Sequence, residues 1–234
     1  MFKEYDKVIL FDTETTGLDF EKDQIIEIAA LIMERVNGTL QATKKYDKFI
    51  SLFAVDKLPD KIKELTHITD EMLAEYGKNE KDVAQEFIQF MEGNKVLLVA
   101  HNAQFDINML YQMLKRNIGS DEAIRLMENK DYLDTQTVLK DRKEYPHRLE
   151  TAIEYYKLSD KCQNSHRAID DVMALTYVAN AMASERDDID QYINVFGYNP
   201  KYGVDGTTFH FIKYKKQFFN KGIVPEDRIL PAMQ

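Results

Sequence analysis

The sequence predicts an α/β fold in which helices flank a five-stranded mixed sheet. Two short, continuous apolar runs, at residues 8–11 and 95–100, are typical of strands that are buried on both faces of a sheet. Each run stops abruptly at polar and acidic residues. Segments with apolar residues at helical spacing lie between these runs and three further strand-like segments. We therefore expect the two runs to form the centre of the sheet.

Composition limits the classes of protein that the chain can represent. With 234 residues, of which 44% are hydrophobic, it can bury the core of one large domain, or of one domain with an appendage. No run approaches the roughly 18 apolar residues of a membrane span, and the first residues lack the order of a signal peptide. We therefore expect a cytoplasmic protein that does not bind membranes. Cys162 is the only cysteine, which excludes an internal disulfide and a thiolate metal cluster.

The charge is negative overall and unevenly distributed. A net charge of −9 argues against a protein that holds nucleic acid by bulk electrostatics. It does not exclude a nucleic-acid enzyme whose metal ions supply local positive charge. Residues 195–234 carry six Lys or Arg against three Asp or Glu, a balance of +3, which leaves −12 for residues 1–194.

The first apolar run ends in two carboxylates. Asp12 and Glu14 are two residues apart, so an extended chain places both side chains on the same side. Two anions at one point repel each other, and a divalent cation, which prefers carboxylate oxygens as ligands, would offset that repulsion. The simpler alternative is a strand end whose carboxylates point into water. This pair alone does not exclude it.

Local signals predict the next elements in order. A polar turn at residues 19–23 precedes a strand over 24–33, and the hairpin signal Asn37-Gly38 leads to a third strand near 44–52. Three helices follow, over residues 59–65, over residues 69–76, and after an N-cap at Asn79 with Val83, Phe87, Ile88 and Met91 on its apolar face.

The second apolar run also ends in polar residues, namely His101, Asn102 and then Asp106. Asn102 is the predicted N-cap of a helix whose apolar face begins at Phe105. Asp106 then lies in or near the first turn of a helix that starts where a central strand stops. Parallel α/β sheets have their binding sites at this edge.

The rest of the chain predicts one more strand, three helices and a distinct end. The elements are a strand at 131–133, a helix from a cap at Asp134 to about 142, a helix over 149–156 after Pro146, and a last core helix over 165–183. We expect one domain over residues 1–184 and a C-terminal extension over residues 185–234.

The last predicted helix carries three candidates for chemistry, His166, Asp170 and Asp171. The residues three before, four after and seven after Asp171 are all apolar, which places Asp171 on the stripe that faces the core. The contrast around Asp170 is weaker. A carboxylate on a buried stripe is unfavourable unless something pairs with it. Taken alone, His166 is better explained as an ordinary surface residue.

Three segments together resemble the motifs of a known family. They are Phe-Asp-Thr-Glu-Thr-Thr-Gly at 11–17, Ala-His-Asn-Ala-Gln-Phe-Asp at 100–106 and His-Arg-Ala-Ile-Asp-Asp at 166–171. In order and spacing they resemble the exonuclease motifs of the DEDDh (DnaQ-like) 3′→5′ exonucleases, which include proofreading subunits and domains of bacterial replicative DNA polymerases. The resemblance covers roughly residues 5–184.

The resemblance implies a fold and a role for each matching residue. The implied fold is ribonuclease H-like, with the first strand central and the second antiparallel to it. The implied ligands of two divalent ions, Mg²⁺ or Mn²⁺, are Asp12, Glu14, Asp106 and Asp171, with His166 as general base. The residues that match positions bordering the terminal nucleotide are Thr15, Gly17, Leu18, Asn102 and Phe105. His67 departs from the family pattern, in which glycine is usual.

The implied reaction is hydrolysis of phosphodiester bonds at single-stranded or frayed 3′ ends of DNA, with release of nucleoside 5′-monophosphates, in proofreading or repair. Two divalent ions about 3.5–4 Å apart can stabilise both the attacking and the leaving oxygen. A histidine, with an unperturbed pKa of about 6.5, suits the base. The alternative is an exoribonuclease that acts on RNA or short oligoribonucleotides, because nothing in the motifs reads the 2′-hydroxyl.

Two further alternatives remain open. A module that binds nucleic acid without catalysis is disfavoured, because such a module would usually lack one of the five motif residues. The motifs do not distinguish a free-standing nuclease from a partner of a DNA polymerase.

The C-terminal extension interleaves aromatic residues with lysines, which can form a stacking platform for a single strand. It can equally form a small strand pair whose aromatic residues pack on the core.

Overall fold

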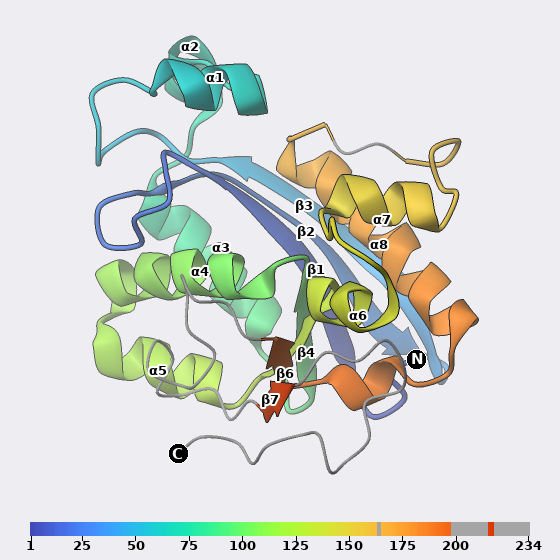
Figure 1. Cartoon of the computed structure of the whole chain (residues 1–234). Coiled ribbons are helices and arrows are strands. Elements are labelled where there is room, and N and C mark those ends of the chain that lie inside the picture. Colours follow the sequence, from blue (N-terminus) through green and yellow to red (C-terminus); the bar gives the residue numbers. More distant parts are fainter. Residues whose placement is uncertain (163–164, 198–214, 218–234) are drawn as a thin grey trace.

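The computed structural model describes residues 1–162, 165–197 and 215–217. Its main sheet has the strand order β3-β2-β1-β4-β5 (Figure 1). β1 is antiparallel to β2 and parallel to β4, β2 is antiparallel to β3, and β4 is parallel to β5. The strands are β1 (Lys7–Thr15), β2 (Ile25–Val36), β3 (Thr39–Phe49), β4 (Val96–Ala100) and β5 (Asp131–Asp134). The predicted mixed sheet, with the first strand central and the second antiparallel to it, is confirmed.

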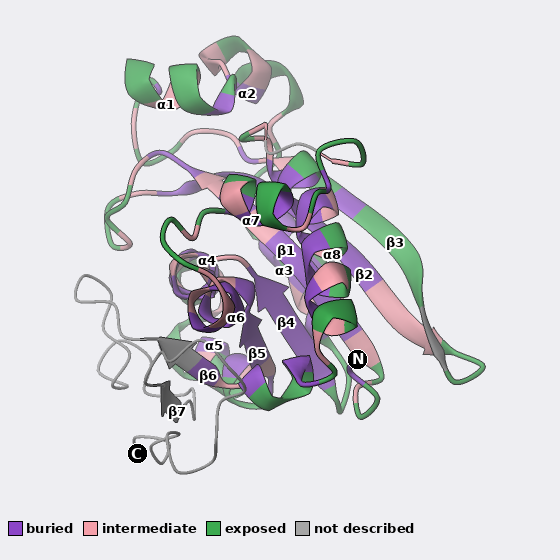
Figure 2. Ribbon diagram, turned by 45° about the vertical axis from the view of Figure 1, so that its right-hand side comes forward, coloured by how far each residue is buried: buried purple, intermediate pink, exposed green. Residues whose placement is uncertain are grey.

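Helices cover both faces of this sheet and form a three-layer molecule. The helices on one face are α3 (Glu80–Met91), α4 (Ala103–Ile118) and α5 (Ser120–Glu128). Those on the other face are α6 (Thr135–Arg142), α7 (Leu149–Tyr155) and α8 (Ala168–Glu185). Figure 2 shows the buried central strands between helices whose outer faces are exposed, with the edge strand β3 partly exposed.

The two apolar runs are buried on both sides, as predicted. In β1, Ile9 and Phe11 belong to the core under α3 and α4, whereas Val8 and Leu10 belong to the core under α8. All five residues of β4 are buried. Because side chains alternate along a strand, a strand between two helical layers has no polar face.

Two short helices, α1 (Asp60–Thr66) and α2 (Asp70–Tyr76), stand away from the layers at the top of Figure 1. They share a small core in which Leu58, Ile68 and Leu73 pack with Ile26 of β2. His67 ends α1 with a φ of 58°, the left-handed conformation that favours glycine at this position. The residue that departs from the family pattern thus adopts the backbone that a glycine would adopt.

β3 and α5 are two of the elements that differ from the predictions. β3 begins at Thr39, directly after the Asn37-Gly38 turn, whereas the sequence predicted a start near 44. This strand lies at the sheet edge and its residues 41–45 are exposed, so they lack the apolar alternation of a half-buried strand. α5 was not predicted. It buries only Ala123 and Met127, which is too few apolar positions for a periodic signal.

The described residues that directly follow α8 pack on the α8 side of the sheet. A 3₁₀ helix, η1 (Ile189–Tyr192), is followed by β6 (Val195–Gly197), which pairs in parallel with β7 (Lys215–Gln217). Ile189, Tyr192 and Val195 are buried. The aromatic residues and lysines of the extension within 198–214 and 218–234 lie outside the described residues. Among the helices of the described residues, none has the length and apolar content needed to cross a membrane.

Candidate active site

The candidate site lies where β1 continues past the end of its neighbour β4. Pairing between these strands stops at Leu10 and Val99, whereas β1 extends to Thr15. On the edge that becomes available, Thr13 donates its backbone N–H and its hydroxyl to Oδ1 of Asp106, over 3.0 and 2.7 Å. Asp106 lies in the first turn of α4, as predicted. The short parallel neighbour therefore leaves room for the helix that carries this carboxylate.

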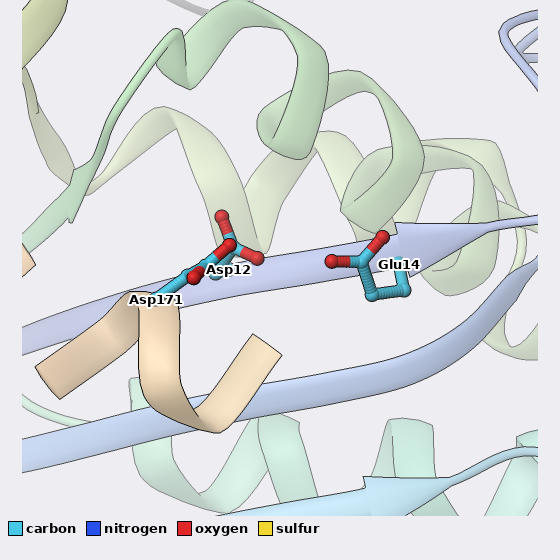
Figure 3. Close-up of side chains that lie close together, drawn as sticks. All are labelled: Asp12, Glu14 and Asp171. Carbon is cyan, nitrogen blue, oxygen red and sulfur yellow. The ribbon is translucent and has the colours of Figure 1, made fainter. Parts of the chain in front are cut away.

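Three of the four predicted carboxylates meet at one point (Figure 3). One oxygen from each of Asp12, Glu14 and Asp171 lies within 4.8 Å of the other two. Asp12 and Glu14 project from β1, and Asp171 comes from the first turn of α8. Asp171 is buried, whereas Asp170 is exposed and accepts a hydrogen bond from the Ser165 hydroxyl over 2.7 Å. The prediction that Asp171 is the aspartate that faces the core is confirmed.

Asp106 approaches from the other side of the sheet. Asp12 and Glu14 lie on the α8 side of β1, because they are in phase with Val8 and Leu10. Asp106 instead binds Thr13, which is in phase with the opposite face, and it is not part of the close group among the described residues. The four carboxylates thus surround the end of β1 from both layers.

Burial raises the pKa of all four carboxylates, and the charges of nearby carboxylates add to this effect. Burial is the largest cause for each. The pKa of Asp12 lies well above its ordinary value, with the charges of Asp106 and Glu14 as the next causes. Burial, with the charge of Asp171 next, raises the pKa of Glu14 to about 9, and the pKa values of Asp106 and Asp171 rise to about 7. This unshielded set of oxygen donors fits hard divalent cations.

His166 lies in an exposed loop before α8. The sequence predicted a helix from Ser165, but α8 begins at Ala168, with Arg167 as its N-cap residue. The reason is local: His166 has a φ of 54°, which lies outside the right-handed helical region. The histidine therefore lies on an irregular segment before the helix and not in its first turn.

The last residue of β1 and the turn that follows it contain three of the residues predicted to border a nucleotide. The Thr15 hydroxyl donates to the carbonyl of Gly17 over 2.6 Å. A Cβ at Gly17 would collide with the carboxylate of Asp23, which accepts a hydrogen bond from the Thr16 hydroxyl over 2.8 Å. Leu18, with 59% of its surface exposed, projects from this turn. The absence of a side chain at Gly17 thus lets the turn close over Asp23.

The other two predicted border residues lie at the start of α4. Asn102 occupies the N-cap position but makes no side-chain cap, because its backbone is left-handed, with a φ of 66°. Its N–H donates to Asp134 over 2.9 Å, and Asp134 also caps α6, as predicted, by accepting from Gln136. The ring of Phe105 packs on that of Phe20, with 5.8 Å between centroids. Since Phe20 belongs to the turn after β1, the two segments adjoin.

Sequence reasoning missed an ion pair beside this site. Glu27 lies opposite Glu14 in the β1–β2 register, is fully buried, and binds Arg167. The available signal was a charged residue inside an otherwise apolar strand, which requires a buried partner. The partner lies 140 residues further along the chain, and no local pattern identifies it.

A family model described as an exonuclease matches residues 9–179. The chain belongs to this exonuclease family. The DNA polymerase III PolC-type protein of Thermotoga maritima is 33% identical over 172 residues, which cover 73% of this chain and 11% of that protein. The DNA polymerase III subunit epsilon of Treponema pallidum is 39% identical over 101 residues, 43% of this chain and 42% of that subunit. The predicted family is therefore confirmed, although the chain spans less than half of either relative.

Solved structures of exonuclease family members share the fold. Exonuclease I of Escherichia coli, in a zinc-bound complex with single-stranded DNA, superposes with a TM-score of 0.67 at 18% identity, over 80% of this chain and 42% of that one. Another exonuclease I structure, described as suggesting how processivity is achieved, gives a TM-score of 0.68 at 17% identity. The similarity covers most of the three-layer domain.

Proposed function

We propose that this chain is a divalent-metal-dependent 3′→5′ exonuclease that hydrolyses phosphodiester bonds at the 3′ ends of DNA and releases nucleoside 5′-monophosphates. One observation carries the proposal. Asp12, Glu14 and Asp171 bring carboxylate oxygens within 4.8 Å of one another, inside the segment that matches the exonuclease family. Burial, and then the charges of neighbouring carboxylates, raise their pKa values, so their ionised forms are unfavourable in the folded protein without a cation.

The residues have distinct roles in the proposed reaction. Asp12, Glu14, Asp106 and Asp171 would hold two divalent cations, Mg²⁺ or Mn²⁺. Such ions lower the pKa of a water nucleophile and stabilise developing charge on the attacking and leaving oxygens. Asp106 keeps one oxygen on Thr13, which fixes the direction of its carboxylate. His166 would accept the proton of the attacking water, a role for which an exposed loop beside the carboxylates leaves the ring free to approach.

The terminal nucleotide would lie between the turn after β1 and the start of α4. Leu18 and Phe105 offer apolar surface for a base, and Thr15, Gly17 and Asn102 lie on the same two segments. DNA is the proposed polymer because the related proteins are DNA polymerase III components and the similar solved structure of exonuclease I holds single-stranded DNA. Partnership with a DNA polymerase is an extension of the same proposal.

Digestion of labelled nucleic acids tests this function. Single-stranded DNA, duplex DNA, duplex DNA with a frayed 3′ end, and RNA of the same sequence would be labelled at the 5′ end and incubated with Mg²⁺, with Mn²⁺ or with EDTA. We expect ladders that shorten from the 3′ end of DNA, nucleoside 5′-monophosphate as product, and no digestion in EDTA. Faster loss of RNA than of DNA would replace the proposed substrate by the exoribonuclease alternative. Inertness on every substrate would refute the enzyme.

A further inference from the structure

A buried ion pair joins the sheet to the helix that carries Asp171. Glu27 of β2 lies directly opposite Glu14 of β1, and its side chain has no exposed surface. A buried carboxylate is strongly unfavourable unless it is both paired and hydrogen-bonded. Its partner, Arg167, is the N-cap residue of α8. The pair therefore connects the strand beside the candidate metal ligands with the first turn of α8.

Both oxygens of Glu27 bind the start of this helix. Arg167 donates from Nε to Oε1 and Oε2 over 3.2 and 3.1 Å, and from Nη2 to Oε1 over 2.8 Å. The backbone N–H of Ala168, the first residue of α8, donates to Oε2 over 3.1 Å. The guanidinium carbon also lies 5.0 Å from the ring centroid of Phe49, the β3 partner of Glu27. Side chain and main chain thus hold the helix start together.

This attachment lies between the two functional residues of the segment. His166 directly precedes Arg167, and Asp171 follows it by one helical turn, so both move with the start of α8. The Arg167 charge also acts to lower the pKa of Glu14, against the carboxylates that raise it. The guanidinium of Arg167 therefore offsets the charge of the buried Glu27 carboxylate beside Glu14.

We propose that Glu27 and Arg167 are positioning residues that fix the start of α8, so that Asp171 reaches Asp12 and Glu14 and the segment with His166 stays beside these carboxylates. The inference rests on the proposed function, which assigns a metal ligand to Asp171 and a general base to His166. Outer partners of metal ligands typically contribute 10- to 100-fold in metal affinity or activity. The alternative role for Arg167 is direct binding of a substrate phosphate, because 28% of its side chain is exposed and an arginine can bind phosphate.

Three variants separate these roles: Glu27→Gln, Arg167→Gln, and the double variant with both. The double variant removes both charges at similar volume, which keeps the test valid if a single variant leaves an unpaired buried charge and folds poorly. Mn²⁺ affinity would be measured by calorimetry without nucleic acid. kcat, KM and the salt dependence of binding would be measured on single-stranded DNA.

If the pair positions the site, Mn²⁺ affinity and kcat fall by about 10- to 100-fold in each single variant, with KM and salt slope unchanged. In the double variant, Mn²⁺ affinity and kcat are no lower than in the more strongly affected single variant, because both substitutions break the same contact. A higher KM and a salt slope lower by about 0.7 in Arg167→Gln alone would instead assign Arg167 to the substrate phosphate and overturn the proposal. Wild-type Mn²⁺ affinity and kcat in all three variants would also overturn it.

Glu80→Gln is the matched control. Glu80 is similarly buried and forms a bidentate pair with Arg116, on the opposite face of the sheet from α8. Loss of this pair should lower the stability of the protein and leave its Mn²⁺ affinity unchanged. If Glu80→Gln lowered Mn²⁺ affinity as much as Glu27→Gln does, the effect would be a general one and the positioning role would be overturned. The Mn²⁺ measurements need no substrate, so a wild-type protein without nuclease activity would refute the proposed function while leaving the positioning role testable.

Discussion

At the scale of single residues, the candidate site concentrates charge that the fold itself does not neutralise. Thr13 donates two hydrogen bonds to Asp106, and Ser165 donates its backbone N–H to Asp171 over 3.2 Å. These bonds lower the pKa of the two aspartates, yet burial dominates and both pKa values rise to about 7. Hydrogen bonds therefore orient the carboxylates, whereas cations are needed to offset their charge.

The base and the ligands should respond differently to pH. Asp12→Ala should remove nearly all activity at every pH, because it deletes one of the proposed metal ligands. His166→Ala should lower kcat by about 10²- to 10⁴-fold near neutrality and recover part of it at higher pH, where hydroxide needs no protein base. Profiles of kcat against pH with saturating Mg²⁺ measure this. A flat, unrecovered loss in His166→Ala would argue against a general base.

The two adjacent aspartates of α8 should differ strongly. Asp171→Asn removes a buried donor of the candidate metal group and should abolish both activity and tight Mn²⁺ binding. Asp170→Asn changes an exposed residue whose partner is Ser165, and should shift stability by no more than about 0.5 kcal/mol with near-normal activity. Parallel measurement of kcat and Mn²⁺ affinity decides. Equal damage from both variants would show that the fourth ligand is wrongly chosen.

At the scale of elements, unequal lengths of neighbouring strands create the site. β1 continues beyond β4, and the first turn of α4 occupies the space where a longer β4 would run. The carboxylates lie at the predicted edge of the sheet. The reason is that residues 12–14 and residue 106 each come shortly after a buried apolar run ends. The strand ends are readable from apolar runs, since a charge inside a doubly covered strand is unfavourable.

The conformation of His67 predicts a stabilising substitution. A non-glycine residue in the left-handed region is disfavoured by roughly 1–2 kcal/mol, and glycine recovers this against a backbone entropy cost of about 0.5–1 kcal/mol. His67→Gly should therefore raise the free energy of unfolding by up to about 1 kcal/mol, as measured by urea denaturation. Glu64→Gly, at an exposed right-handed position of α1, is the control and should lower it by about 1 kcal/mol. A destabilised His67→Gly would contradict the left-handed cap.

At the scale of the whole molecule, all three layers contribute carboxylates around the end of β1. β1 supplies Asp12 and Glu14, α4 supplies Asp106 from one face, and α8 supplies Asp171 from the other. Repulsion at that point acts on the stability of the entire domain, because burial of these residues and folding of the layers occur together.

This coupling predicts a dependence of stability on pH that divalent metal reverses. The folded pKa of Glu14 is about 9 and those of Asp106 and Asp171 are about 7, against about 4 in an unfolded chain. Between these values the folded state binds more protons, so stability in EDTA should fall as pH rises from about 5 to about 9. Mg²⁺ should add about 2.7 kcal/mol at 100 times its Kd, and more at high than at low pH.

Thermal denaturation in EDTA and in Mg²⁺ across this pH range measures the effect. Asp12→Ala is the control, since it should raise the melting temperature in EDTA at high pH and remove the gain from Mg²⁺. A melting temperature that rises with pH in EDTA would contradict the raised pKa values.

The sequence by itself determined most of the elements, the edge of the sheet at which the carboxylates gather, and which of Asp170 and Asp171 faces the core. These are local properties, because periodicity and the ends of apolar runs depend on neighbours within a few residues. It did not determine α5, the length of the edge strand β3 or the start of α8, where few apolar residues are buried or the backbone turns left-handed.

Only the tertiary structure decided how distant residues combine. Thr13 and Asp106 are 93 residues apart, and Glu27 and Arg167 are 140 residues apart. Glu27 could be recognised from the sequence as a buried charge that needs a partner, but several arginines and lysines could have supplied it. The path of the chain through three layers selects Arg167, because α8 must cross β2 where Glu27 faces it.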